Sequence, residues 1–161
     1  MATALTPLAN ITLGSAAASV TFSSIVGTYR DLYLVSQIGN TTNNDIRISF
    51  NGDNAGTSYS MTYAAGDGSS PYAGADNSYP YVRISLAYPY NDNASVLSVH
   101  VMDYSTTDKH KSGLLRIGGT RGVQMEAFRW ASTAAITSLN ITGSAGNLTA
   151  GSTFALYGVS A

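Results

Sequence analysis

Cysteine, charge and histidine are the scarce ingredients of this 161-residue chain. It has no cysteine, which excludes a disulfide scaffold, a thiolate metal site and a thiol nucleophile. Charged residues make up 11% of the sequence. There are 8 basic and 9 acidic side chains, which gives a net charge of −1. A protein that binds nucleic acid or an anionic membrane carries a basic patch. We therefore expect neither nucleic acid nor a membrane as a partner.

Groups that could carry catalysis are few. His100 lies inside an alternating segment and is expected to be a half-exposed strand histidine, whereas His110 belongs to a charged cluster at residues 108–111 that is typical of a solvated turn. Glu126 is the only glutamate. A glycosidase pair of Asp103 with Glu126 stays open but disfavoured, and no G-x-S-x-G elbow is present. The sequence predicts no enzyme, no catalytic residue and no cofactor.

A metal site is not expected either. Residues 51–56 superficially resemble a calcium loop, but the first and fifth positions of the pattern fail and no bidentate glutamate follows. The segment is better interpreted as a hairpin turn. A surface calcium on Asp45, Asp53 or Asp92 stays an unspecific alternative.

The amino-terminal residues carry neither a basic region nor an apolar stretch of the kind found in signal peptides. No apolar run elsewhere approaches bilayer length. We expect neither a leader peptide nor a membrane span.

Apolar residues alternate with polar ones over most of the chain, which is typical of half-buried strands. The pattern predicts about ten strands separated by Gly, Asn, Asp and Ser turns. An all-β, antiparallel two-sheet sandwich of jelly-roll type follows, with a closed barrel as the alternative. The expected strands are residues 11–13, 20–22, 29–37, 46–50, 58–63, 82–86, 96–104, 113–117, 123–130, 135–141 and 153–159.

Four local expectations accompany this pattern. Residues 15–18 could form a single helical turn. The Asn51-Gly52 pair favours a type I′ turn, and a hairpin into residues 58–63 is its natural continuation. Residues 64–80 show no alternation and are expected to be the longest loop. Residues 153–159 are apolar on both faces, so the closing strand is expected to be covered on both sides.

We expect residues 1–19 to form an arm with the first short strand, and residues 20–161 to form the sandwich. The arm is predicted to order only on a partner. The candidate docking residues of the arm are Leu5, Pro7, Leu8 and Ile11.

Tyrosine is the one residue type in excess, with 11 copies. Its large apolar ring and polar tip suit a subunit interface or stacking on a sugar. The interface interpretation is preferred over glycan binding. The candidate residues, which concentrate around the expected long loop, are Tyr72, Tyr79, Tyr81, Tyr88 and Tyr90.

Several segments together resemble a family of tailed-bacteriophage virion proteins, which are small β-sandwich proteins of the capsid decoration, head-fibre or tail-fibre type. No single motif is diagnostic. The family often has proline where this chain has Val26. The segments that carry the resemblance are residues 22–32, 46–53, 102–104, 109–111, 130–139 and 151–159.

The resemblance implies a structural role without a catalytic residue. We expect a capsid decoration (cement) protein on the virion exterior, which binds the major capsid protein and stabilises the particle as a homotrimer. The alternative is a tail-fibre or spike-tip domain that binds a host surface glycan.

Overall fold

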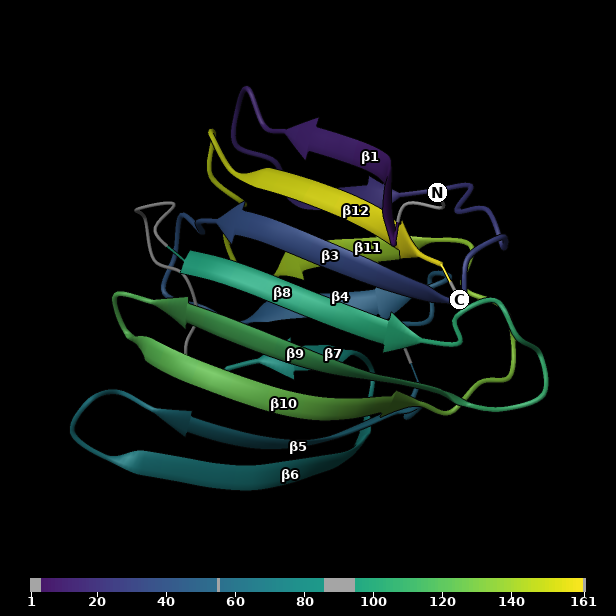
Figure 1. Cartoon of the computed structure of the whole chain (residues 1–161). Helices are drawn as coiled ribbons and strands as arrows, with labels where there is room; N and C mark the ends of the chain where they lie inside the picture. The colour runs from purple at the N-terminus through teal and green to yellow at the C-terminus, as the bar shows by residue number, and fades with distance from the viewer. Residues whose placement is uncertain (1–3, 55, 86–94, 161) are drawn as a thin grey trace.

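The computed structural model describes residues 4–54, 56–85 and 95–160, and its regular structure there consists of strands in two antiparallel sheets (Figure 1). The eight-stranded sheet has the order β1-β12-β3-β8-β9-β10-β5-β6, and the four-stranded sheet the order β2-β11-β4-β7. This confirms the all-β sandwich, with twelve strands instead of about ten. The strands are β1 (Leu5–Thr12), β2 (Ser19–Phe22), β3 (Asp31–Ile38), β4 (Ile46–Phe50), β5 (Tyr59–Gly66), β6 (Pro71–Tyr79), β7 (Val82–Ile84), β8 (Ser95–Met102), β9 (Lys111–Gly119), β10 (Gly122–Trp130), β11 (Leu139–Gly143) and β12 (Thr153–Val159).

The core lies between the two sheets, because each strand turns alternate side chains toward the other sheet. β3 contributes Leu32 and Leu34, and β4 contributes Ile46, Ile48 and Phe50, all of them buried. Burying a side chain of this size contributes about 1.5–3 kcal/mol. Alternation therefore gives the large sheet two faces: an inner face on the core and an outer face that no described strand covers (Figure 1).

The closing strand β12 is an interior strand of the large sheet, paired with β1 on one side and β3 on the other. Phe154, Leu156 and Gly158 are buried on its inner face. Ala155 and Tyr157 on the other face are half-exposed. The expectation that both faces are covered is therefore wrong, because no second layer lies over the outer face in the described part of the chain.

Residues 64–80 are not a long loop: they are mostly strand, since β5 and β6 form a hairpin. Asp67 builds its turn by accepting hydrogen bonds at Oδ1 from the Ser69 and Ser70 N–H groups, both at 2.8 Å. The alternation is missing because β6 is an edge strand that is exposed along most of its length. Proline is tolerated at its first residue, Pro71.

The Asn51-Gly52 turn has the expected conformation but not the expected continuation. Both residues have positive φ, 53° and 72°, and the Asp53 N–H donates to the Phe50 carbonyl at 2.9 Å, as a type I′ turn requires. However, β4 lies in the small sheet and β5 in the large one. The Tyr59 hydroxyl fixes this crossing, since it accepts from the Phe50 N–H at 2.9 Å and donates to the Asp53 carbonyl at 3.1 Å.

Two other expected elements differ. The strand expected at residues 135–141 begins only at Leu139, because the Asn51 side chain takes up the backbone groups before it: Oδ1 accepts from the Thr137 and Ser138 N–H groups at 2.8 and 3.0 Å. Residues 15–18 form no helical turn. Ala17 instead makes an isolated β-bridge with Leu148.

The expected arm is part of the large sheet. β1 runs antiparallel along β12 from Leu5 opposite Val159 to Thr12 opposite Thr153, with a register shift between Pro7 and Ala9. In this fold the segment is hydrogen-bonded to β12 along its length. Its docking role stays a prediction.

Candidate functional site

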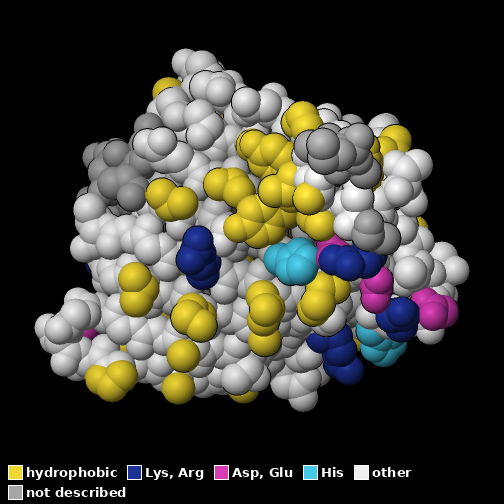
Figure 2. Space-filling view, in the orientation of Figure 1, with side chains coloured by type: hydrophobic (Ala, Val, Ile, Leu, Met, Phe, Trp, Pro, Cys, Tyr) yellow, Lys and Arg dark blue, Asp and Glu magenta, His cyan; other side chains and the backbone are white. Residues whose placement is uncertain are grey.

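The outer face of the large sheet carries most of the exposed large apolar side chains. Nine such residues occur in the described part of the chain, and the strand registers place seven of them on this face. Figure 2 shows apolar side chains spread over this side of the molecule, with basic and histidine side chains between them. The seven residues are Leu5, Val35, Val96, Met102, Leu114, Val123 and Met125.

Exposure reaches 67% for Met125, 61% for Val123 and 54% for Leu114. All three lie on the neighbouring strands β9 and β10, beside the small residues Ala127 and Ala64 of the same face. Apolar patches on a monomer are uncommon unless they bind something. We call this set of outward-facing side chains on the eight strands the open face.

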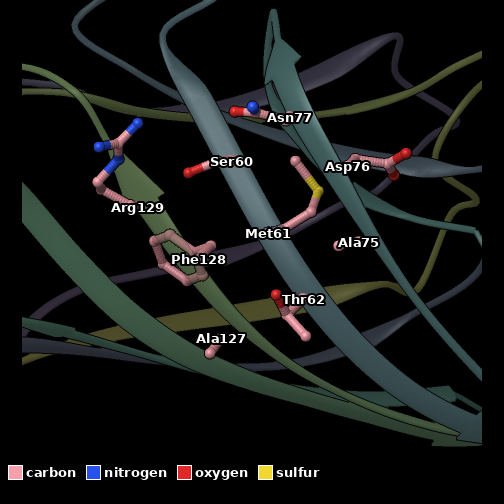
Figure 3. A pocket seen from close by; sticks show the side chains of 9 residues that line it. All are labelled: Ser60, Met61, Thr62, Ala75, Asp76, Asn77, Ala127, Phe128 and Arg129. Carbon is pink, nitrogen blue, oxygen red and sulfur yellow. The ribbon is translucent and has the colours of Figure 1, made fainter.

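The open face is grooved. Its largest hollow has a volume of about 740 Å³ and includes Tyr33, His100, Leu114, Arg116 and Met125 in its lining. A second hollow of about 410 Å³ lies over β10, β5 and β6. Figure 3 shows this second hollow, with Arg129 and Asn77 toward one end and Thr62 and Ala127 toward the other.

Charge on the open face is one-sided. Arg116 and Arg129 are exposed there, and Arg116 donates from Nε to Ser98 Oγ at 3.2 Å. The acid among its described residues is Asp31, which is buried and lies 2.8 Å from Arg30 and 3.0 Å from His100. The face therefore presents cations in a chain whose net charge is −1.

Asp31 fixes the position of His100, a polar residue in the lining of the large hollow, through a contact of 3.0 Å. Burial by itself would raise the pKa of this carboxyl, but hydrogen bonds from Arg30, the Asp103 N–H and His100 outweigh burial and lower it. His100 is half-exposed, as predicted for a strand histidine, and its ring lies edge-on to Tyr33 with centroids 6.3 Å apart. Tyr33, His100 and Arg116 thus form an oriented polar wall beside an apolar floor.

The tyrosines chosen from the sequence do not form this site. Tyr79 and Tyr81 pack edge to face at 5.2 Å, and the guanidinium groups of Arg83 and Arg47 lie over their rings at 5.0 and 4.4 Å. Tyr72 donates instead to Asp67 in the β5–β6 turn at 2.9 Å. Tyr88 and Tyr90 lie outside the described residues.

The four arm residues divide between two surfaces. The register of β1 places Leu5 and Pro7 on the open face. Leu8 and Ile11 instead pack against the core. Leu8 and Ile11 are half-buried and line a separate hollow of about 320 Å³, so the docking role of all four residues stays a prediction.

The structure does not bring the acidic candidates together. Glu126 points into the core and is 3% exposed, whereas the Asp103 carboxylate faces Lys109 in an exposed turn at 3.4 Å. Asp45 lies near Arg83, and Asp53 accepts the Trp130 indole N–H at 2.7 Å. No group of three or more His, Asp or Glu that could hold a metal occurs in the part of the chain that the structure describes. Asp92 lies outside it.

Lys111 and Glu126 are buried titratable residues whose burial the sequence pattern does not predict. Lys111 is 0% exposed although its expected surroundings are a solvated turn, while Asp108 and His110 are exposed as expected. Burial raises the pKa of Glu126 to about 8, although the hydrogen bond from Gln124 acts in the opposite direction. The only sequence signal for the burial of Glu126 is its position two and four residues before Phe128 and Trp130, which places all three on the same face of a strand.

No helix among the described residues is long and apolar enough to cross a membrane. No family model and no curated protein matches the chain. It is similar to solved structures: a galectin, LEC-6, of Caenorhabditis elegans (8% identity, 94% of this chain and 96% of that one, TM-score 0.34), an exo-inulinase of Aspergillus awamori (11%, 96% and 29%, 0.40) and domains LG4-5 of the mouse laminin α1 chain (12%, 91% and 40%, 0.35).

At these identities the likeness concerns the fold alone, a β-sandwich distantly similar to galectin and laminin G domains. None of the three is named as a phage virion protein. The expected family therefore finds no support in these comparisons.

Proposed function

We propose that the chain is a non-enzymatic docking module that binds a partner protein through the open face. One observation carries this proposal: seven of the nine exposed large apolar side chains lie on that face. Covering them would remove apolar area from water at about 25 cal/mol per Å². The face combines exposed Met and Arg side chains, which are enriched in protein–protein interfaces, with exposed Leu and Val.

Charge complementarity defines the partner. Arg116 and Arg129 stand on the open face and its acid, Asp31, is already paired. A partner surface with carboxylates around exposed apolar groups would complement it. A second copy docked face to face would add two more arginines and no unpaired carboxylate, so the proposed occupant is a different protein.

Capsid decoration is docking of this kind, with the major capsid protein as the partner. The role on the virion exterior and the homotrimer remain proposals that rest on the resemblance of the sequence. The open face supports docking without identifying the particle.

The capsid role is tested by rebinding: a phage particle that carries this chain is purified, stripped of the chain and offered the purified chain again. Leu114→Glu combined with Met125→Glu should weaken rebinding at least tenfold, since two carboxylates would replace the apolar centre. Val26→Glu is the matched control, because Val26 is 52% exposed and lies away from the face. Equal rebinding of both variants, or no rebinding of the unmodified chain, would reject the proposal.

Glycan binding is the second candidate, and the oriented wall of Tyr33, His100 and Arg116 favours it. A hollow whose lining includes a guanidinium, a tyrosine ring and apolar side chains suits a sugar that carries a carboxylate. On a glycan array, the unmodified chain should then bind acidic glycans, and Arg116→Ala should abolish the signal. Arg121→Ala should retain it, because Arg121 is an exposed arginine of the β9–β10 turn that does not line the hollow. Silence of the unmodified chain across the array would exclude this candidate.

A further inference from the structure

The outer edge of β6 is an open strand edge that the fold leaves unprotected. β6 is nine residues long and ends the order of the large sheet, so no described strand pairs with this side of it. Half of the backbone N–H and C=O groups of an edge strand point away from its neighbour. A row of such groups is a template for another strand.

The other three sheet edges are blunted. β1 carries Pro7 and a register shift beside it, and both features hinder pairing. The edges of the small sheet, β2 and β7, are only four and three residues long. β6 has its proline at the first residue, and its irregularity lies toward Ser78, where φ is 59°. Residues 72–76 stay regular.

We propose that two copies of the chain pair antiparallel through their β6 edges about a two-fold axis at Gly74. In this register Ala73 faces Ala75 of the second copy, and Tyr72 faces Asp76. Asp76 is the only charged residue of β6, so no like charges stand opposite each other. The small side chains at the axis allow the strands to approach to about 4.8 Å.

This pairing extends the proposed docking function without depending on it. Ala73 belongs to the lining of the 740 Å³ hollow and Ala75 to that of the 410 Å³ hollow. The pair would therefore set the two open faces side by side and leave both accessible. It replaces the homotrimer that the sequence resemblance implies by a dimer, because a two-fold edge pair is closed and leaves no site for a third copy.

Sedimentation equilibrium of the full chain over a hundredfold range of concentration tests the pairing. We expect a monomer–dimer equilibrium. Ala73→Lys combined with Ala75→Lys should weaken the dimer at least tenfold, because four ammonium groups would meet at the axis. Thr62→Lys combined with Ala64→Lys is the control, since these exposed residues stand opposite Ala75 and Ala73 on β5, one strand inward.

A chemical test uses the absence of cysteine from the chain. Chains with Ala73→Cys and chains with Ala75→Cys, mixed and oxidised, should form a disulfide between the two variants, because opposed Cβ atoms lie about 4.5–5.5 Å apart. A monomer at every concentration, a trimer, a dimer that survives the two lysines, or failure of this cross-link would each overturn the proposal.

Discussion

Lys111 is a buried cation that joins two irregular segments. Its Nζ donates to the carbonyls of Thr106 at 2.7 Å, Lys109 at 2.9 Å and Thr133 at 3.3 Å. Burial lowers the pKa of this lysine. The three carbonyls need a donor that no apolar side chain can supply. Lys111 therefore holds the turn after β8 against the segment after β10.

Lys111→Met should destabilise the fold by about 1–3 kcal/mol, since three carbonyls would lose their donor in part-buried hydrogen bonds. Urea unfolding measures the change. Lys109→Met is the control: its ammonium group is exposed and pairs only with surface carboxylates, so a loss of less than about 0.5 kcal/mol is expected. Equal stability of the two variants would show that the three hydrogen bonds contribute nothing.

Glu126 makes stability depend on pH in the direction opposite to that of an ordinary surface carboxylate. Its pKa is about 8 in the fold against 4.5 ordinarily. Between these values the folded chain holds a proton that the unfolded chain releases. Stability should thus be full below pH 4.5 and fall as the pH rises to about 8.

Glu126→Gln should remove this slope. The variant and the unmodified chain should be similarly stable at pH 5, and the variant more stable by about 2–4 kcal/mol at pH 9, because each pKa unit corresponds to about 1.4 kcal/mol. Urea unfolding at both pH values gives the comparison. Parallel pH profiles would mean that Glu126 is ionised in the folded chain.

At the scale of elements, Asn51 replaces a strand partner for residues 135–138. Besides the two N–H groups at Oδ1, its Nδ2 donates to the Ala135 carbonyl at 2.8 Å. Asn51→Gly keeps the positive φ but loses all these bonds, so we expect a loss of about 2–3 kcal/mol. Asn51→Asp keeps the acceptor and should lose less. Thermal unfolding ranks the variants, and the reverse order would contradict this role.

The same elements show what sequence periodicity can predict. Alternation along the chain predicts which residues of β12 are buried, and the Asn-Gly dipeptide predicts the conformation of the turn at residues 51–52. In β10, by contrast, Val123 and Met125 are exposed while Gln124 and Glu126 are buried. Taken alone, the alternation of these four residues would assign the apolar ones to the core and the polar ones to solvent. Phe128 and Trp130, further along the strand, show that the opposite assignment is correct.

The remaining differences are non-local. β6 has no core-facing alternation because an edge strand need not bury a face, so its residues resemble a loop. The segment before β11 is irregular because a side chain some eighty residues earlier satisfies it. The open face was missed for a related reason: its members come from eight strands and gather only when the sheet is assembled.

At the scale of the whole molecule, no described strand covers the open face of the large sheet, and the net charge is −1. Little long-range repulsion keeps such molecules apart. The exposed apolar area should therefore determine how soluble the chain is. Salts that are excluded from protein surfaces should precipitate it through contacts between these open faces.

Val96→Thr, Val123→Thr and Met125→Thr together should raise the ammonium sulfate concentration needed for precipitation. The melting temperature should hardly change, since the three residues are 56–67% exposed and threonine suits strands. Val26→Thr, a comparable exposed valine off the face, should change precipitation much less. If docking occurs where we propose, the triple variant should also lose its partner, because one apolar surface would serve both contacts. A variant that precipitates later but binds as before would separate the two properties and place the docking surface elsewhere.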